Sequence, residues 1–113
     1  MGEKGTKLSQ QATTASEQVV QSLAAVGEVS SRKMFGGYGI FESGAMFALV
    51  NAQGEVFLKA DGSNRSRFDE AGANQHGRMP YFQVPAAVLE DEIALQDWAR
   101  TSIEIAHAGK KSE

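Results

Sequence analysis

The stretch from residue 29 to residue 60 constrains the fold more than any other part of the chain. Valine, phenylalanine, tyrosine and isoleucine are frequent there, and apolar residues lose their helical spacing. The cluster Gly36-Gly37-Tyr38-Gly39 breaks the first apolar segment, and turn sequences follow at Ser43-Gly44 and at residues 51–54. The pattern predicts three consecutive antiparallel strands in a meander. Ala45–Val50 should lie in mid-sheet, because it is apolar at nearly every position.

Amphipathic helices are predicted on both sides of this stretch. Thr14 and Glu17 fit a capping box, and Gly27 fits a left-handed cap that closes the first helix. Asp91 is placed to cap a helix over residues 92–107. The apolar stripe of that last helix consists of Leu95, Trp98, Ala99, Ser102, Ile103 and Ala106.

The region between the meander and the last helix predicts shorter elements. Asp61 or Ser63 can cap a helix over residues 64–71 that Gly72 stops. Residues 79–84 read as a strand at an edge of the sheet, because Pro80 lacks the amide that a central strand needs. Residues 85–89 form a turn of helix or a loop.

The resulting order is α-β-β-β-α-β-α, which predicts an α+β fold. We expect a two-layer sandwich, in which an antiparallel sheet carries helices on one face. The 113 residues suffice for one such domain. We expect it over residues 13–108, with a disordered polar tail at residues 1–12 and a second tail at residues 109–113.

Composition excludes several kinds of site. The chain has no cysteine, so disulfides, thiolate metal sites and a cysteine nucleophile are ruled out. Its two histidines, His76 and His107, have no ligand-like neighbours in the sequence. We therefore expect no catalytic residues, no metal and no cofactor. No apolar run could cross a membrane and no secretory leader is evident, which favours a cytoplasmic protein.

The glycine cluster has more than one interpretation. It departs from the dinucleotide-binding pattern, because a strand rather than a helix follows it. We favour a bulge or sharp bend, where the missing Cβ atoms allow positive φ or close backbone approach. The alternative is an anion-binding nest beside Arg32 or Lys59, in a small-ligand module or an enzyme not otherwise evident.

A surface that docks another protein is the second candidate site. Residues 28–68 are slightly basic and residues 90–106 are acidic, so the molecule is polarised in charge. The predicted interaction patch consists of Arg32, Lys33, Gly36, Gly37, Tyr38, Lys59, Asn64 and Arg65. We do not expect direct DNA binding, because the net charge is −3. Weak nucleic-acid binding is kept as an alternative, and it would need several exposed aromatic side chains on one basic face.

The sequence resembles the N-terminal domain of the TfoX/Sxy family of bacterial competence regulators. The stretch Arg32-Lys33-Met34-Phe35-Gly36-Gly37-Tyr38-Gly39-Ile40-Phe41 carries this resemblance, together with Tyr81-Phe82-Gln83-Val84-Pro85. The likeness extends over about residues 15–107, although the linker at residues 74–78 looks shorter than in the family. It implies a fold similar to type III secretion chaperones and YjbR-like proteins.

The resemblance also implies a function. Full-length family members activate genes for DNA uptake together with the cyclic-AMP receptor protein, and they carry a second, C-terminal domain that we expect this chain to lack. No catalytic residues come with the family. We therefore predict a small non-enzymatic regulatory or protein-interaction domain. Its partner would be a protein such as the transcription machinery or a regulator of the cyclic-AMP receptor type.

Overall fold

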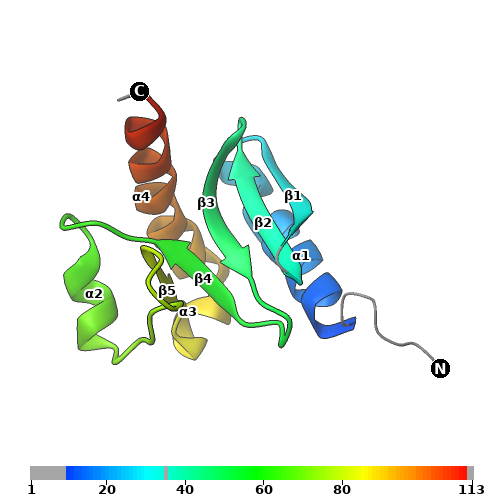
Figure 1. The fold of residues 1–113 in the computed structure, drawn as a ribbon, viewed down its shortest axis with the longest axis horizontal. Coiled ribbons are helices and arrows are strands. Elements are labelled where there is room, and N and C mark those ends of the chain that lie inside the picture. Colours follow the sequence, from blue (N-terminus) through cyan, green and yellow to red (C-terminus); the bar gives the residue numbers. More distant parts are fainter. Residues whose placement is uncertain (1–9, 35, 112–113) are drawn as a thin grey trace.

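The structure, a computed structural model, describes residues 10–34 and 36–111 and consists of a five-stranded sheet with helices (Figure 1). Along the chain the elements are α1 (Gln10–Ser22), the 3₁₀ turn η1 (Ala24–Val26), β1 (Val29–Met34), β2 (Gly37–Glu42), β3 (Ala45–Val50), β4 (Val56–Lys59), α2 (Arg65–Glu70), β5 (Tyr81–Gln83), α3 (Ala86–Leu89) and α4 (Glu92–Lys111).

The sheet is antiparallel throughout, and its spatial order is β1-β2-β3-β4-β5. The predicted α+β class and antiparallel sheet are confirmed. β3 is the central strand, as expected from its uninterrupted apolar sequence, and β5 lies at an edge, where Pro80 is tolerated just before it. In Figure 1, α1 and the first part of α4 lie behind the strands, and the end of α4 projects beyond them.

The predicted element order α-β-β-β-α-β-α is wrong in two places. Four strands precede α2, because the glycine cluster ends one strand and begins another: Gly36 has a φ of +76°, and Met34 pairs with Gly37 across this turn. Residues 86–89 form the additional short helix α3, where the sequence left a turn of helix or a loop open.

The first helix begins earlier than predicted, so the capping box at Thr14 is wrong. α1 starts at Gln10, and Thr14 lies inside the helix, where its hydroxyl accepts a hydrogen bond from the Gln10 side chain. Ala12 and Ser16 are buried one turn apart, so the amphipathic pattern already begins in the presumed tail. Residues 10–12 are therefore helical, and residues 1–9 of that tail lie outside the described residues.

Gly27 is not a left-handed cap either. Its φ of 161° is extended backbone, and the chain has already left α1 through the η1 turn. The glycine has a different role, because a Cβ atom there would overlap the Glu42 side chain and displace its carboxylate.

The last helix confirms its predicted start and apolar stripe. A side-chain oxygen of Asp91 accepts the amides of Ile93 and Ala94, as a helix cap does. Of the predicted stripe, four members are buried: Leu95, Ala99, Ser102 and Ala106. The helix continues to Lys111, so residues 109–111 do not form the predicted tail, and residues 112–113 lie outside the described residues.

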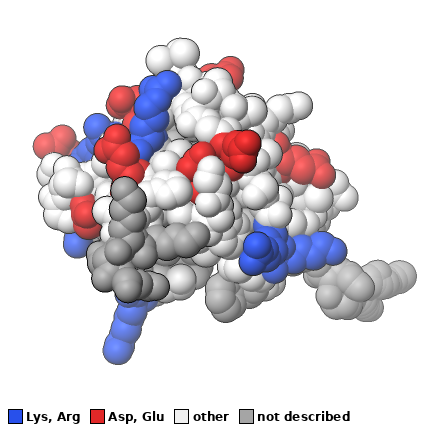
Figure 2. All heavy atoms as spheres, turned by 90° about the horizontal axis from the view of Figure 1, so that it is seen from above, with Lys and Arg blue, Asp and Glu red and all other residues white. Residues whose placement is uncertain are grey.

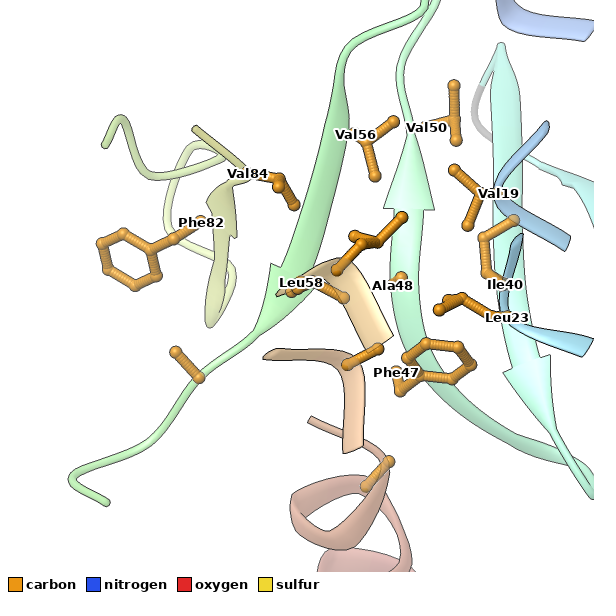
Figure 3. Packing of buried hydrophobic residues seen from close by; sticks show 14 of the residues in the cluster. Val19, Leu23, Ile40, Phe47, Ala48, Val50, Val56, Leu58, Phe82 and Val84 are labelled. Atoms are coloured by element: carbon orange, nitrogen blue, oxygen red, sulfur yellow. The ribbon is translucent and has the colours of Figure 1, made fainter. Parts of the chain in front are cut away.

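The core lies between the sheet and the helices (Figure 3). Val19 and Leu23 are directed toward Ile40 and Phe47 of the sheet, and Phe47 is fully buried. All four α-helices contribute side chains to this cluster: Ala12 and Val19, Phe68, Val88, and Leu95 with Ala99 and Ala106. The helices therefore lie on one face of the sheet, as the sequence predicted.

We expect Phe47→Ala to lower the free energy of unfolding by about 3–5 kcal/mol, since it would leave a cavity in the centre of this core. Trp98 is only half-buried and packs edge-on against Phe68 of α2, with ring centroids 5.0 Å apart. Trp98→Ala should therefore cost less, about 2 kcal/mol. Urea denaturation of both variants tests this ranking, and an equal or larger loss for Trp98→Ala would contradict the packing described here.

Candidate interaction surface

The structure separates the members of the predicted patch on β1. Arg32 pairs with Gly39 and Lys33 with Tyr38, and adjacent strand residues point to opposite faces of a sheet. The Tyr38 hydroxyl lies 3.0 Å from the Thr13 hydroxyl of α1, so Tyr38 and Lys33 are on the helix side. Arg32 is on the opposite face, where its guanidinium carbon lies 4.8 Å from the centre of the Phe41 ring.

Asn64 and Arg65 do not join Arg32 either. Asn64 is only 4% exposed, so its place in an exposed patch is wrong. Its side chain accepts the Asp61 amide and donates to the Lys59 carbonyl, which fixes the turn before α2. Arg65 lies 4.5 Å from the ring centre of Phe82, on the helix side of the sheet.

The glycines of the patch form the turn and the close strand contact of the sheet. Gly36 is exposed at the turn, whereas Gly37 and Gly39 are buried and paired in the ladder with β1. A Cβ atom on Gly37 would overlap the carbonyl oxygen of Val50, so the backbones of β2 and β3 approach closely there. The predicted close backbone approach is confirmed, but the predicted bulge or bend within one strand is wrong, because the cluster forms the hairpin turn between β1 and β2. This geometry gives no support to an anion nest, because residues 37–39 are engaged in strand pairing.

The face of the sheet away from the helices carries a second, smaller apolar cluster. Leu49, Phe57 and Tyr81 form its buried part, and Met46 and Met79 pack against them. Its members come from strands and from the loop before β5, and none comes from a helix of the described chain. We call this side of the sheet the methionine face, and define it by Met34, Phe41, Met46, Leu49, Phe57, Met79 and Tyr81.

A glycine lies beneath two methionines on this face. A Cβ atom built on Gly39 would lie 2.7 Å from the Met34 sulfur and 3.2 Å from the Met46 sulfur. The same atom would lie 3.1 Å from the Phe41 ring. The two thioethers therefore occupy the space that a side chain at position 39 would fill. Met34, Phe41 and Met46 remain partly exposed.

The other half of the methionine face is closed by a loop. The His76 ring meets the Phe57 ring edge-on at 4.9 Å, and Met79 packs beside it. The Tyr81 hydroxyl donates a 3.4 Å hydrogen bond to the Met46 carbonyl, and burial raises the pKa of Tyr81. A depression of about 310 Å³ lies at this end, between Met46, Lys59, Tyr81 and the end of α4.

Both charged side chains at the strand positions of this face are cationic. The strand positions that point away from the helices include Arg32 on β1 and Lys59 on β4, whose ammonium lies 6.0 Å from the Tyr81 ring. The remaining positions on that side of the five strands are occupied by serine, glycine, glutamine and the apolar residues of the methionine face. Of the charged residues in the predicted patch, Arg32 and Lys59 thus share the methionine side of the sheet, whereas Lys33 and Arg65 are on the helix side.

Sequence reasoning missed the methionines. Met34, Met46 and Met79 are the three methionines after Met1, and all lie on this face. Their strand positions could have indicated it, because Met34 is two residues from Arg32 and both therefore lie on one side of β1.

Glu42 and His107 form the closest contact between a carboxylate and a histidine. His107 Nε2 donates to Glu42 Oε1 at 2.7 Å, while Oε2 accepts the Glu28 amide and the Ser43 hydroxyl. The histidine hydrogen bond, helped by these two donors, lowers the pKa of Glu42. Because the carboxylate lies between the hydroxyl and the imidazole, the group cannot pass a proton from serine to histidine as a catalytic triad does. It joins β2, the start of β1 and α4.

Residues 10–34 and 36–111 contain no group of three histidine or acidic side chains that could hold a metal ion. No helix among them is long and apolar enough to span a membrane.

These features define a class of protein: a small α+β domain with all its helices on one face of a five-stranded sheet and an apolar opposite face. Residues 21–106 match the family model of the TfoX N-terminal domain, so the chain belongs to that family. DNA transformation protein TfoX1 of Aliivibrio fischeri (strain ATCC 700601 / ES114) is 38% identical over 50 residues. The match covers 44% of this chain and 23% of that protein, less than a quarter of its length.

Glu42→Gln should lower the free energy of unfolding by about 1–2 kcal/mol at neutral pH, because the charge-assisted hydrogen bonds are lost. The pKa of Glu42 lies below its ordinary value of 4.5 in the folded protein, so the carboxylate stabilises the fold above that pH. This contribution is lost as the pH falls through the lowered pKa. Urea denaturation at about pH 7 and about pH 3 should therefore show the difference shrinking in acid.

Glu104→Gln, at an exposed position of α4, is the control and should change stability little at either pH. A loss for Glu42→Gln that is equal at both pH values would contradict the role given to the carboxylate.

Gly37→Ala should destabilise the fold far more than Gly39→Ala. At position 37 the new methyl meets backbone that cannot move without separating β2 from β3, and we expect a loss of about 3 kcal/mol or more. At position 39 it meets chiefly the mobile ends of two methionines, and we expect about 1 kcal/mol or less. Thermal unfolding of both variants checks this order, and the reverse order would disprove the close approach at Gly37.

Proposed function

We propose that this chain is a non-enzymatic regulatory domain that helps to control the genes for DNA uptake, and that it acts through contacts with other proteins. The proposal rests on its membership of the TfoX N-terminal domain family and on the name of the transformation protein that it resembles. The match spans a small part of that protein, so the role is inferred from a shared domain.

One observation carries the protein-contact part of the proposal: one face of the sheet is apolar and partly exposed, and among the described residues no helix contributes to its apolar cluster, which the end of α4 borders only beside Met46 and Tyr81. The partly exposed members of this face are Met34, Phe41, Met46 and Met79, and apolar surface that reaches solvent is found at sites that bind other proteins. The polar groups that could suggest catalysis have structural partners instead. The Glu42 carboxylate joins three parts of the fold, and Asp91 caps α4.

Direct binding of nucleic acid has less support. Phe57 and Tyr81 are each only 5% exposed, so their rings are not available as platforms for bases. Phe41 is partly exposed but lies under the Arg32 guanidinium. Figure 2 shows acidic and basic side chains interspersed on the end of the molecule that it displays, and the net charge is −3.

The partner that this function requires is a protein of the transcription apparatus, in the cytoplasm. It would be the transcription machinery itself or a regulator of the cyclic-AMP receptor type, as the resemblance to competence regulators implies. A domain of 12.1 kDa without a basic groove on its sheet could reach a promoter by binding such a protein rather than by reading DNA.

Deletion of the gene in its native host tests the proposal. We expect the frequency of natural transformation and the transcripts of DNA-uptake genes to fall, and a plasmid copy of the gene to restore both. In a gel-shift titration from low salt upward, the purified domain alone should leave promoter DNA unshifted. Unchanged transformation and transcripts would overturn the regulatory role, and a shift by the domain alone would overturn the protein-contact mechanism.

A further inference from the structure

We propose that the methionine face binds one amphipathic helix of a partner protein, with acidic residues beside the apolar stripe of that helix. The inference rests on the proposed function, in which the domain acts through another protein, and it specifies the chemistry of that partner. Three features of the face support it: its geometry, its charges and its methionines.

The geometry favours a helix. An extended segment would join a sheet at an edge, where it finds backbone partners, whereas on a face covered by side chains its amides and carbonyls would stay unpaired. A helix satisfies its own backbone hydrogen bonds and can lay an apolar stripe on a sheet. The opposite face of this sheet is already covered in this way by α1 and α4.

The charges favour an acidic helix. Arg32 and Lys59 lie on β1 and β4, so cations stand on either side of the apolar residues of β2 and β3. The strand residues on this face include no acid that could neutralise them. Glutamate or aspartate beside the apolar stripe of a partner would complement this pattern. A second copy of the same face would instead bring cations together.

The methionines favour an adaptable contact. Met34 and Met46 are partly exposed, and their sulfur atoms lie over Gly39. Rotation of these unbranched side chains would uncover the space above the glycine, and an apolar side chain of the helix could enter it. A residue larger than glycine at position 39 would occupy that space in the free domain. The glycine thus makes room for methionines that can move aside.

Methyl NMR of the whole chain labelled at its methionines tests the proposal. The probe is a synthetic helical peptide of about 18 residues, with leucine at i, i+3, i+4 and i+7 spacing and glutamate elsewhere. We expect it to shift the methyl signals of Met34, Met46 and Met79, while the signal of Met1 serves as an internal reference. The same peptide with lysine in place of glutamate should bind at least about tenfold more weakly.

A pair of charge variants locates the contact. Arg32→Glu with Lys59→Glu should weaken binding of the acidic peptide by about tenfold or more. Lys33→Glu with Arg100→Glu changes the net charge equally, but Lys33 is on the helix side and Arg100 is exposed on α4. This control should bind like the unchanged chain. Core methyl signals verify that both variants are folded, and Arg32→Gln with Lys59→Gln replaces the first pair if it does not fold.

Several outcomes would overturn the inference. These are equal binding of both peptides, equal loss in the two variants, and absence of any shift of the three methionines. Methionine shifts that depend on protein concentration alone would indicate a second copy as the occupant, and shifts caused by single-stranded DNA would indicate nucleic acid. Any of these results leaves the transformation phenotype untouched, so failure here is distinguishable from failure of the regulatory role.

Discussion

All four α-helices of the described chain contribute side chains to the core on one side of the sheet, where α1 and α4 pack directly on the strands, and the rest of the molecule depends on this one-sided burial. The helix side is a tightly filled core around Phe47 and Leu58, both fully buried. The strands must cover the other side with their own side chains and one loop. That cover is complete over Phe57 and Tyr81, where His76 and Met79 close it, and incomplete over β1 and β2.

This asymmetry separates stability from function within a small domain. Three polar side chains make hydrogen bonds that hold the fold: Asn64 in a turn, Asp91 in a helix cap, and Glu42 between elements. The methionine face lies outside the main core, so its partly exposed residues are available for contacts with a partner protein. An apolar surface with two cations is suited to a reversible complex with another protein, because it offers adaptable packing together with charge selection.

Much of the fold followed from the sequence, because hairpin turns and apolar periodicity act locally. The strands around Ser43-Gly44, the Asp91 cap and the edge position of β5 were predicted correctly. The cap predicted at Thr14 is wrong because the apolar pattern of α1 starts before that residue. The helix cap predicted at Gly27 is wrong because the contact that involves this glycine is with Glu42, which is distant in sequence. The candidate site was harder to predict, because only the register of the strands shows which face of the sheet each side chain occupies. Arg32 and Lys33 are neighbours in sequence and point to opposite sides. The likeness to secretion chaperones and YjbR-like proteins stays a prediction.

The proposed contact requires that the part of the methionine face over β1 and β2, with Met34 and Met46, is accessible to solvent in the free protein. Relaxation of the methionine methyl signals by a water-soluble gadolinium chelate measures this most directly. The account predicts strong relaxation for Met34 and Met46 and little for the core methyls of Leu23 and Leu58, which are 0% exposed. Protection of Met34 and Met46 equal to that of the core would contradict it, because some other part of the molecule or a second copy would then cover the face.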